Sequence, residues 1–379
     1  MFTRYALIAN SVPAADEAVA LSPSAPEAHR ARATVLNRLQ KPAEAATSLE
    51  IASGLRYRDD YLWIELGNTR EELGNTESAL AALDQAVHWA PYYAHTHWQR
   101  GNLLLRMGRT SDAFAELRKA AEANSTYAPN LIDLAWGISK ADIQTTESLL
   151  NINDDTKRLA LIRFLARKGK GSEVVDQIRS LTTPLSTENR TELARLLFAG
   201  GSFAEAATLA NMAEASILNG RFEEPLVVNE SGFGWIIAPE LKSRLAIDVS
   251  EKLGGARSLQ INLDGTWAPE TTLLSQTFIV KPGIDYRLSF GVSTKDLVTG
   301  GPPVLTVVDA KNNRLLGKPV NFPTGTTPWV RHGVEFMATT PAVVVRLQRS
   351  NCDSSPCPIF GTLWLDEFYI EQTPGPVDR

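Results

Sequence analysis

The sequence is poor in the side chains and patterns on which many enzymes and nucleic-acid-binding proteins depend. It has five histidines and two cysteines in 379 residues, and its net charge of −5 comes without clusters of Lys and Arg. Such clusters are the electrostatic footprint of proteins that bind nucleic acid or anionic membranes. No run of apolar residues approaches the roughly 18 to 20 that a membrane-spanning helix needs. We therefore expect neither nucleic-acid binding nor a membrane span in this chain.

Catalytic motifs are missing as well. The sequence has no Gly-x4-Gly-Lys-Ser/Thr phosphate loop, no Gly-x-Ser-x-Gly nucleophile turn and no His-Glu-x2-His zinc motif. His95 and His97 lie two residues apart at an expected helix start, where their side chains point in different directions. The sequence therefore predicts a protein that is not an enzyme. A glycan-active enzyme that uses two carboxylates distant in the sequence stays as an alternative.

The two cysteines, Cys352 and Cys357, lie in one short loop, Cys-Asp-Ser-Ser-Pro-Cys. Two thiols cannot complete a four-ligand zinc site, and no histidine is near them in the sequence. They predict a disulfide that closes a hairpin loop, which implies an oxidising compartment. The alternative is a pair of free thiols in a cytosolic loop.

The first half of the chain repeats itself every 34 residues. From Asp60 one unit shows Trp63, Leu66, Gly67, Arg70, Ala79, Leu83, Ala86 and Pro91. The equivalent residues 34 positions later are His97, Arg100, Gly101, Leu104, Ala113, Leu117, Ala120 and Ser125, and those 34 positions earlier are His29, Arg32, Ala33, Leu36, Ala45, Leu49, Ala52 and Tyr57. The pattern resembles the tetratricopeptide repeat, with Arg70 and Leu83 as departures. The resemblance implies a solenoid of packed helix pairs, which we expect over residues 1–217.

The repeat pattern weakens at both ends of this region. Residues 142–155 break the spacing, and two further helical pairs are predicted over residues 156–181 and 188–215. Weak terminal units are expected because the last unit must cap the stack. Residues 14–23 look like the second helix of an incomplete repeat. We therefore expect a missing N-terminal segment, which could carry a signal peptide or a membrane anchor.

A solenoid of this kind usually binds a peptide or a partner protein on its concave face. In the family, one helical position on that face often carries an Asn that grips the peptide, and the resemblance places Asn68 and Asn102 there. The family's basic partner position holds Arg30, Ile64 and Trp98, so a complete carboxylate clamp is absent. The predicted peptide site comprises Asn68, Asn102, Trp98 and Arg30. The alternative is that the two Asn residues are solvated helix positions.

The periodicity changes to that of β-strands at about Leu218. Apolar residues then alternate with polar ones between turns that are rich in Pro, Gly, Asn and Asp. The expected strand faces include Leu259/Ile261/Leu263, Gln276/Phe278/Val280, Tyr286/Leu288/Phe290, Leu305/Val307, Val334/Phe336, Val343/Val345/Leu347 and Trp364/Asp366/Phe368. They predict a sandwich over residues 218–379. The fold class is α+β multidomain, with an N-terminal all-α solenoid and an all-β antiparallel jelly-roll sandwich.

Both ends of the β region resemble jelly-roll carbohydrate-binding modules of the galactose-binding-like superfamily. The opening reads Asn219-Gly-Arg-Phe-Glu, followed by Gly234-Trp235, and the ending reads Leu363-Trp-Leu-Asp-Glu-Phe. In such modules a carboxylate from each end often holds a structural calcium ion, and the resemblance assigns Glu223 and Asp366 to this role. Backbone carbonyls would complete the six to eight oxygens that calcium needs. The alternative is that both carboxylates solvate strand ends or pair with basic side chains.

Sugar binding requires an exposed aromatic ring that stacks on a pyranose, with polar side chains beside it. Trp267, in the loop Asp-Gly-Thr-Trp-Ala-Pro, is the candidate ring, and Gln276 and Arg287 are candidates for contacts to hydroxyls. The tryptophans expected in the core are Trp235, Trp329 and Trp364.

The sequence predicts a non-catalytic accessory protein of the bacterial cell envelope, whose solenoid binds a protein partner and whose sandwich binds a polysaccharide or another protein. This prediction is an analogy at the level of folds. One alternative is a protein-interaction scaffold in which the sandwich only caps the solenoid. The expected location is the periplasm or cell envelope, and the alternative is the cytoplasm.

Overall fold

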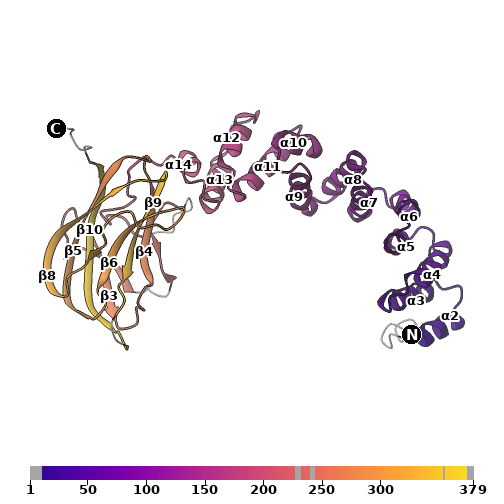
Figure 1. The fold of residues 1–379 in the computed structure, drawn as a ribbon, viewed down its shortest axis with the longest axis horizontal. Helices are drawn as coiled ribbons and strands as arrows, with labels where there is room; N and C mark the ends of the chain where they lie inside the picture. The colour runs from indigo at the N-terminus through magenta and orange to yellow at the C-terminus, as the bar shows by residue number, and fades with distance from the viewer. Residues whose placement is uncertain (1–10, 227–231, 240–243, 353–354, 374–379) are drawn as a thin grey trace. The chain divides into compact units, whose positions relative to one another are not determined.

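The computed structural model describes residues 11–226, 232–239, 244–352 and 355–373. The chain divides into two compact units, residues 1–160 and residues 161–379. Each unit is described by itself below, and Figure 1 shows their elements. None of the helices in the described ranges is long and apolar enough to cross a membrane.

The first unit consists of paired antiparallel helices (Figure 1). In chain order they are α2 (Val12–Leu21), α3 (Pro26–Arg38), α4 (Pro42–Leu55), α5 (Asp60–Glu72), α6 (Thr76–Trp89), α7 (Ala94–Arg106), α8 (Thr110–Ala123), the 3-10 turn η1 (Ser125–Tyr127), α9 (Ala128–Ile138) and α10 (Ile143–Leu150). Helix α11 (Asp155–Arg167) begins in the first unit and ends in the second. We call α3, α5 and α7 the first helices of their repeats, and α4, α6 and α8 the second helices.

Glycine allows the two helices of a repeat to approach closely, as the 34-residue pattern predicted. A Cβ atom added at Gly67 would lie 2.9 Å from Cγ of Leu83. One added at Gly101 would lie 2.6 Å from Cγ of Leu117. The equivalent residue of the earlier repeat is Ala33, which is buried at 1% exposure. The small residues therefore mark the crossing point of each helix pair.

A repeated hydrogen bond from a side chain to the backbone joins each first helix to the loop before it. The side chain at the fourth position of the helix bonds to the backbone carbonyl six residues upstream. His29 contacts the oxygen of Pro23 at 2.8 Å, Trp63 donates to that of Tyr57 at 2.8 Å, and His97 contacts that of Pro91 at 2.7 Å. In α9 this position is Leu131, which has no polar atom to offer. The regular pattern ends there, and the following α10 has only eight residues.

The second unit begins with the end of α11 and continues through α12 (Gly171–Arg179), α13 (Thr187–Ala199) and α14 (Phe203–Leu209). The two predicted helical pairs thus exist, although α14 is shorter than expected. Gly200 marks the turn between α13 and α14. An added Cβ there would lie 2.5 Å from the backbone oxygen of Ala166. The predicted change from helix to strand near Leu218 falls between α14 and the first strand.

The strands of the second unit form two five-stranded antiparallel sheets, with the orders β1-β4-β9-β6-β7 and β2-β3-β10-β5-β8. The strands are β1 (Ile236–Ile237), β2 (Leu245–Asp248), β3 (Ser258–Asp264), β4 (Thr272–Ile279), β5 (Asp285–Thr299), β6 (Pro303–Asp309), β7 (Val320–Asn321), β8 (Gly325–Met337), β9 (Ala342–Arg349) and β10 (Ile359–Gln372). Inward side chains of both sheets form one apolar core. The predicted fold class is confirmed, an all-α region followed by an antiparallel sandwich.

Most predicted strand faces are confirmed, but the last one is wrong. Trp364, Asp366 and Phe368 do not share a face, because β10 has an irregularity between Asp366 and Tyr369. Glu367 adopts a left-handed backbone conformation there, with φ 50°. The extra residue shifts the alternation of side chains, so Phe368 joins the apolar core, whereas the buried Asp366 side chain bonds to the loop between β2 and β3.

Candidate functional site

A row of exposed and half-buried aromatic side chains runs along the starts of α5 and α7 to the turn before α9. The ring centroids of Tyr61 and His95 are 6.3 Å apart, as are those of Tyr93 and His95. The Tyr127 hydroxyl lies 3.5 Å from Nδ1 of His95, and the Tyr127 ring centroid lies 4.8 Å from that of Trp98. Tyr61 and Tyr93 are 45% and 53% exposed. We call Tyr61, Tyr93, His95, Trp98 and Tyr127 the aromatic stripe.

The repeat itself brings these rings together. Tyr61 and His95 are 34 residues apart, and each is the second residue of its helix, α5 or α7. The Asp59 carboxylate accepts a hydrogen bond from the backbone N–H of Tyr61 at 3.2 Å and caps the start of α5. Trp98 is the fifth residue of α7, and Tyr127 directly precedes α9. Neighbouring repeats therefore place their rings on one continuous surface.

Ion pairs between consecutive repeats flank the aromatic stripe. Arg30 donates to both carboxylate oxygens of Glu65, at 2.8 and 2.9 Å. Arg106 forms the equivalent two-bond pair with Glu71. The hydrogen bond to Glu65 raises the pKa of Arg30. Its guanidinium also lies 5.0 Å from the ring centroid of Tyr61, which continues the stripe onto α3 by a cation–π contact.

The structure places all four residues of the predicted peptide site on these same helices. Asn68 is exposed on α5, and Asn102 is half-buried on α7. Arg30 is held by Glu65, and Trp98 packs against Tyr127. Their role in peptide binding stays a prediction. The sequence reasoning missed the tyrosines of the stripe, although the 34-residue interval between Tyr61 and His95 is a signal that could have found them.

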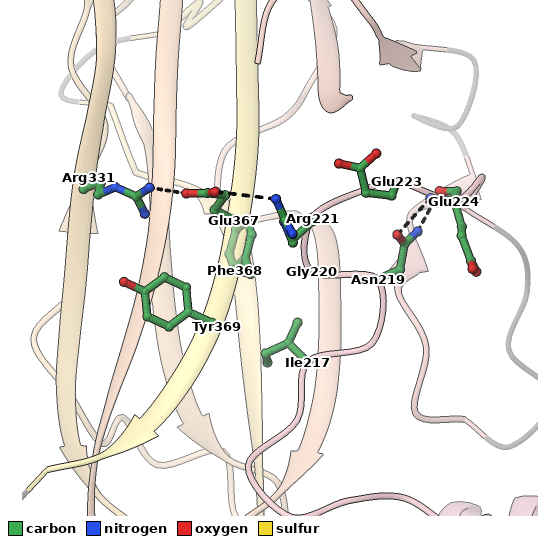
Figure 2. A pocket seen from close by; sticks show the side chains of 10 residues that line it. All are labelled: Ile217, Asn219, Gly220, Arg221, Glu223, Glu224, Arg331, Glu367, Phe368 and Tyr369. Atoms are coloured by element: carbon green, nitrogen blue, oxygen red, sulfur yellow. Dashed lines mark hydrogen bonds and ion pairs between the residues drawn. The ribbon is translucent and has the colours of Figure 1, made fainter. Parts of the chain in front are cut away.

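In the second unit, an open cavity of about 700 Å³ lies beside the end of β10. Figure 2 shows Arg331, Glu367 and Arg221 in a row, with Tyr369 and Ile217 on one side of it. Glu367 pairs with Arg331 and lies 4.0 Å from Arg221. The two arginine side chains are 51% and 58% exposed, and that of Glu367 is 17% exposed. The carboxylate therefore binds one accessible guanidinium group and lies near a second.

An aromatic ring completes this cavity. Tyr369 is 45% exposed and follows the irregularity in β10 that turns its side chain outward. Asn219 is held beside the cavity by two bonds to the backbone of Glu224, one donated at 2.7 Å and one accepted at 3.2 Å (Figure 2). A ring next to fixed planar polar groups is a combination that suits a polyhydroxylated ligand.

The predicted calcium ligands do not fit a metal site. The two oxygens of Asp366 accept three backbone N–H bonds, two on Oδ2 from Leu253 and Gly254 at 3.0 Å and one on Oδ1 from Glu367 at 2.7 Å. Glu223 accepts a bond from the backbone N–H of Ala256 at 2.8 Å. N–H donors thus take up most of the Asp366 lone pairs and one of those of Glu223, which leaves fewer oxygen lone pairs for a cation. Among the described residues, no group of three or more His, Cys, Asp or Glu side chains could hold a metal ion.

These carboxylates instead fasten the loop between β2 and β3. Asp366 is fully buried, and burial raises the pKa of its carboxyl group. Two of its three backbone donors, Leu253 and Gly254, lie in that loop, as does Ala256, the donor to Glu223. The prediction of a structural calcium ion at Glu223 and Asp366 is therefore corrected to a hydrogen-bonded anchor.

The prediction of a sugar-binding ring at Trp267 is wrong. The side chain is only 2% exposed and belongs to the sandwich core. Its Nε1 donates to the backbone oxygen of Thr271 at 3.3 Å, and its own carbonyl accepts a bond from Arg349. A ring covered in this way cannot stack on a pyranose. Its position in a loop with Gly and Pro suggested exposure, but the loop folds inward.

The two polar partners predicted for Trp267 also differ from expectation. Gln276 is fully buried, and its amide exchanges two 3.0 Å hydrogen bonds with the backbone of Leu218. It fastens the segment before β1 and is not free for a ligand. Arg287 remains exposed on β5 and pairs with Glu335 at 3.4 Å. Of the three predicted glycan contacts, only Arg287 is accessible.

Cys352 and Cys357 form the predicted disulfide. Beside it lies Arg349, a buried arginine that is 2% exposed. Its guanidinium donates to Thr299 Oγ1 at 2.9 Å, to the oxygens of Gly301 and Pro358, and to Cys357 Sγ at 2.9 Å. Burial lowers the pKa of Arg349. The disulfide loop is thus packed around a buried cation that is satisfied mainly by carbonyl oxygens.

A sequence model described as the tetratricopeptide repeat matches residues 8–55 and 64–129. The helices within these two ranges therefore match the tetratricopeptide repeat, a fold that generally serves protein interaction. The search of curated proteins gave no match. Similar solved structures include two kinds of protein, carbohydrate-binding modules and helical repeat proteins.

A structure titled "CBM4 structure and function" is 13% identical, has a TM-score of 0.31, and spans 42% of this chain and 100% of its own. A crystal structure of MamA is 14% identical with a TM-score of 0.29, over 53% of this chain and 86% of its own. The Yersinia enterocolitica type III secretion chaperone SycD, in complex with a peptide of the translocator YopD, is 18% identical with a TM-score of 0.27. The match covers 33% of this chain and 88% of the SycD chain. These likenesses are too low to support a functional inference.

Proposed function

We propose that this protein is a non-catalytic binding protein whose tetratricopeptide repeats bind an extended peptide segment of a partner protein. The observation that carries the proposal is the aromatic stripe, in which Tyr61 and Tyr93 are about half exposed while touching the other rings. Exposed clusters of aromatic side chains are typical of interaction surfaces, where they supply most of the binding energy. Asn68 and Asn102 lie on the same helices and could bond to a peptide backbone.

Two matched variants of the full chain test this function. Tyr61→Ala removes a ring from the stripe, whereas Tyr92→Ala removes a tyrosine that is 91% exposed in the loop before α7. Both would be tested with the wild type on an array of short synthetic peptides of varied sequence. We expect Tyr61→Ala to weaken binding of the selected peptides by about thirtyfold, the effect of losing about 2 kcal/mol at an interface hot spot. Tyr92→Ala should bind as the wild type does.

The proposal fails if every peptide that the wild type binds is bound equally well by Tyr61→Ala and by a second stripe variant, Trp98→Ala. Circular dichroism of each variant shows whether its helices are intact. If Tyr61→Ala loses helical signal as well as binding, the binding measurement is made with Tyr61→Phe instead. This variant keeps the ring and should bind as the wild type does.

The cavity beside β10 supports a second function, the binding of a saccharide by the sandwich. Tyr369 offers a ring for the apolar face of a sugar, and Arg331 and Arg221 offer donors for its hydroxyl groups. Glu367 between them pairs with Arg331, lies 4.0 Å from Arg221 and can itself accept a bond. This arrangement replaces the predicted site around Trp267, whose ring is covered. The ligand chemistry is that of a sugar ring with adjacent hydroxyl groups.

Isothermal titration calorimetry of the full chain with a panel of neutral and acidic oligosaccharides tests this second function. Tyr369→Ala should abolish heat of binding, and Phe360→Ala should leave it unchanged. Phe360 is a fitting control because it is 49% exposed on the same strand and does not line the cavity. If no saccharide binds, the alternative of a pure protein-interaction scaffold is favoured, in which the sandwich has a structural role.

We propose that the protein resides in the periplasm or cell envelope of a bacterium. The disulfide between Cys352 and Cys357 supports this location, because disulfides persist in oxidising compartments and are rare in the cytosol. Maleimide labelling of freshly lysed source cells, with and without prior reduction, tests the placement. Labelling only after reduction is expected. Equal labelling without reduction would favour the cytoplasm.

A further inference from the structure

Charged side chains of the helices that carry the aromatic stripe pair with one another across repeats. Arg30 of α3 binds Glu65 of α5, and Glu71 of α5 binds Arg106 of α7, each through two hydrogen bonds. Such two-bond pairs are stronger and more fixed in geometry than single contacts. A charged partner would have to compete with them for each arginine or glutamate. The surface therefore favours a ligand that is recognised through uncharged groups.

The uncharged groups on this surface are aromatic rings and side-chain amides. Asn68 is the ninth residue of α5 and Asn102 the ninth residue of α7, so they occupy the same position of consecutive repeats. A polyproline II segment has no internal hydrogen bonds, and its carbonyl oxygens are free to accept bonds from such amides. Aromatic-lined grooves are the usual binding surfaces for this conformation, since proline rings pack on aromatic faces. An α-helical ligand would offer no free carbonyls along its length.

From these groups we propose that the peptide bound by the aromatic stripe is a proline-rich segment in the polyproline II conformation. The inference rests on the proposed peptide-binding function and names its ligand. The spacing of the rings agrees with it. Tyr61 and His95 occupy the same position of consecutive repeats, and their ring centroids lie 6.3 Å apart. Two residues of polyproline II span about 6 Å, at about 3.1 Å per residue. A ligand in this conformation that runs across the helices can therefore contact both rings.

A carboxylate-gripping mode does not fit the same surface. The position that would carry the basic residue holds Ile64 on α5, which is 3% exposed, and Trp98 on α7. The arginine at this position in the first repeat, Arg30, is already bound to Glu65. A ligand that runs across the helices is therefore held along its length and not by its C-terminal carboxylate.

Fluorescence anisotropy with the full chain and a fluorescein-labelled decaproline peptide tests the proposal. Labelled Gly-Ser and amphipathic α-helical decapeptides serve as comparison ligands. We expect decaproline to bind and both comparison peptides to bind at least about tenfold more weakly. Tyr61→Ala should weaken decaproline binding by at least about tenfold, the scale of a lost aromatic contact, and Tyr92→Ala should not change it. The affinity should change less than about twofold between low and high salt, because few free charges take part.

Two results would overturn the proposal in different ways. If peptides without proline bind in a manner that depends on Tyr61 while decaproline does not bind, the ligand class is wrong and peptide binding by the stripe stands. If neither decaproline nor any array peptide binds in a manner that depends on Tyr61, both the ligand class and the proposed function are refuted. A strong salt dependence of decaproline binding would also contradict the role assigned to uncharged groups.

Discussion

Replacing Gly101 by alanine tests the close helix contact on which the repeats are built. The added Cβ would lie 2.6 Å from Cγ and 2.8 Å from Cδ2 of Leu117, and 3.1 Å from the backbone oxygen of Ala113. Cγ is the branch point of the leucine side chain and cannot swing away, and the oxygen belongs to α8. Overpacking of this kind costs about 1–3 kcal/mol. Alanine regains about 1 kcal/mol of helix propensity, so the net loss of unfolding free energy should be up to about 2 kcal/mol.

Gly54 provides the matched control, because it is also a helical glycine of the first unit. A Cβ added there meets nothing within 4 Å. Gly54→Ala should therefore show only the gain in helix propensity, about 0.5–1 kcal/mol. The difference between the two variants isolates the cost of the contact with Leu117, which we expect to be about 1–3 kcal/mol.

Urea unfolding followed by circular dichroism at a helix-sensitive wavelength measures both variants in the full chain. The midpoint should fall for Gly101→Ala and rise for Gly54→Ala, with similar slopes. If Gly101→Ala were as stable as Gly54→Ala, the two helices of this repeat could separate without cost. The explanation of the small residues as contact points would then be refuted.

Two further predictions concern the sandwich. Trp267→Ala should lower the stability of the sandwich by about 3–5 kcal/mol, as for other buried aromatic residues. The saccharide affinity of the folded molecules should not change. An unchanged melting temperature would show that the ring is not a core residue. Burial raises the pKa of Asp248, but hydrogen bonds from Ser250 and Trp364 outweigh it and lower the pKa to about 2. The Asp248 carboxylate stabilises the fold above the unfolded-state pKa of 3.8, and this contribution is lost as the pH falls toward 2. The free energies of unfolding of the wild type and Asp248→Asn should therefore differ at pH 7 and converge near pH 2. A stability difference that persists at pH 2 would contradict this assignment.

The helical repeats could be predicted in detail because their pattern is local. A repeat of 34 residues fixes which side chains face each other across a helix pair, and Gly67 and Gly101 mark the crossing points. The same period could have revealed the aromatic stripe, since Tyr61 and His95 occupy one position of successive repeats. The ion pairs were harder to predict. Arg30 and Glu65 occupy different positions of neighbouring repeats, and the pairing depends on how side chains lean across the contact.

The sites of the sandwich could not be predicted in the same way. Alternation of apolar and polar residues identified most strand faces, because the side-chain period of a strand is two residues. A single irregularity at Glu367 reversed the faces at the end of β10 and turned Tyr369 outward. Tertiary contacts also decided the burial of Trp267, which the composition of its loop does not reveal.

The sequence by itself determined the repeat, the change to β-strands and the pairing of the two cysteines, because each depends on residues near one another in the chain. The tertiary structure decided which side chains gather at a site. Glu367, Arg331 and Arg221 meet from distant segments, and Asp366 turns to backbone N–H groups in place of a metal ion. Such choices depend on long-range packing and on the registers of strand pairs, which local periodicity does not encode.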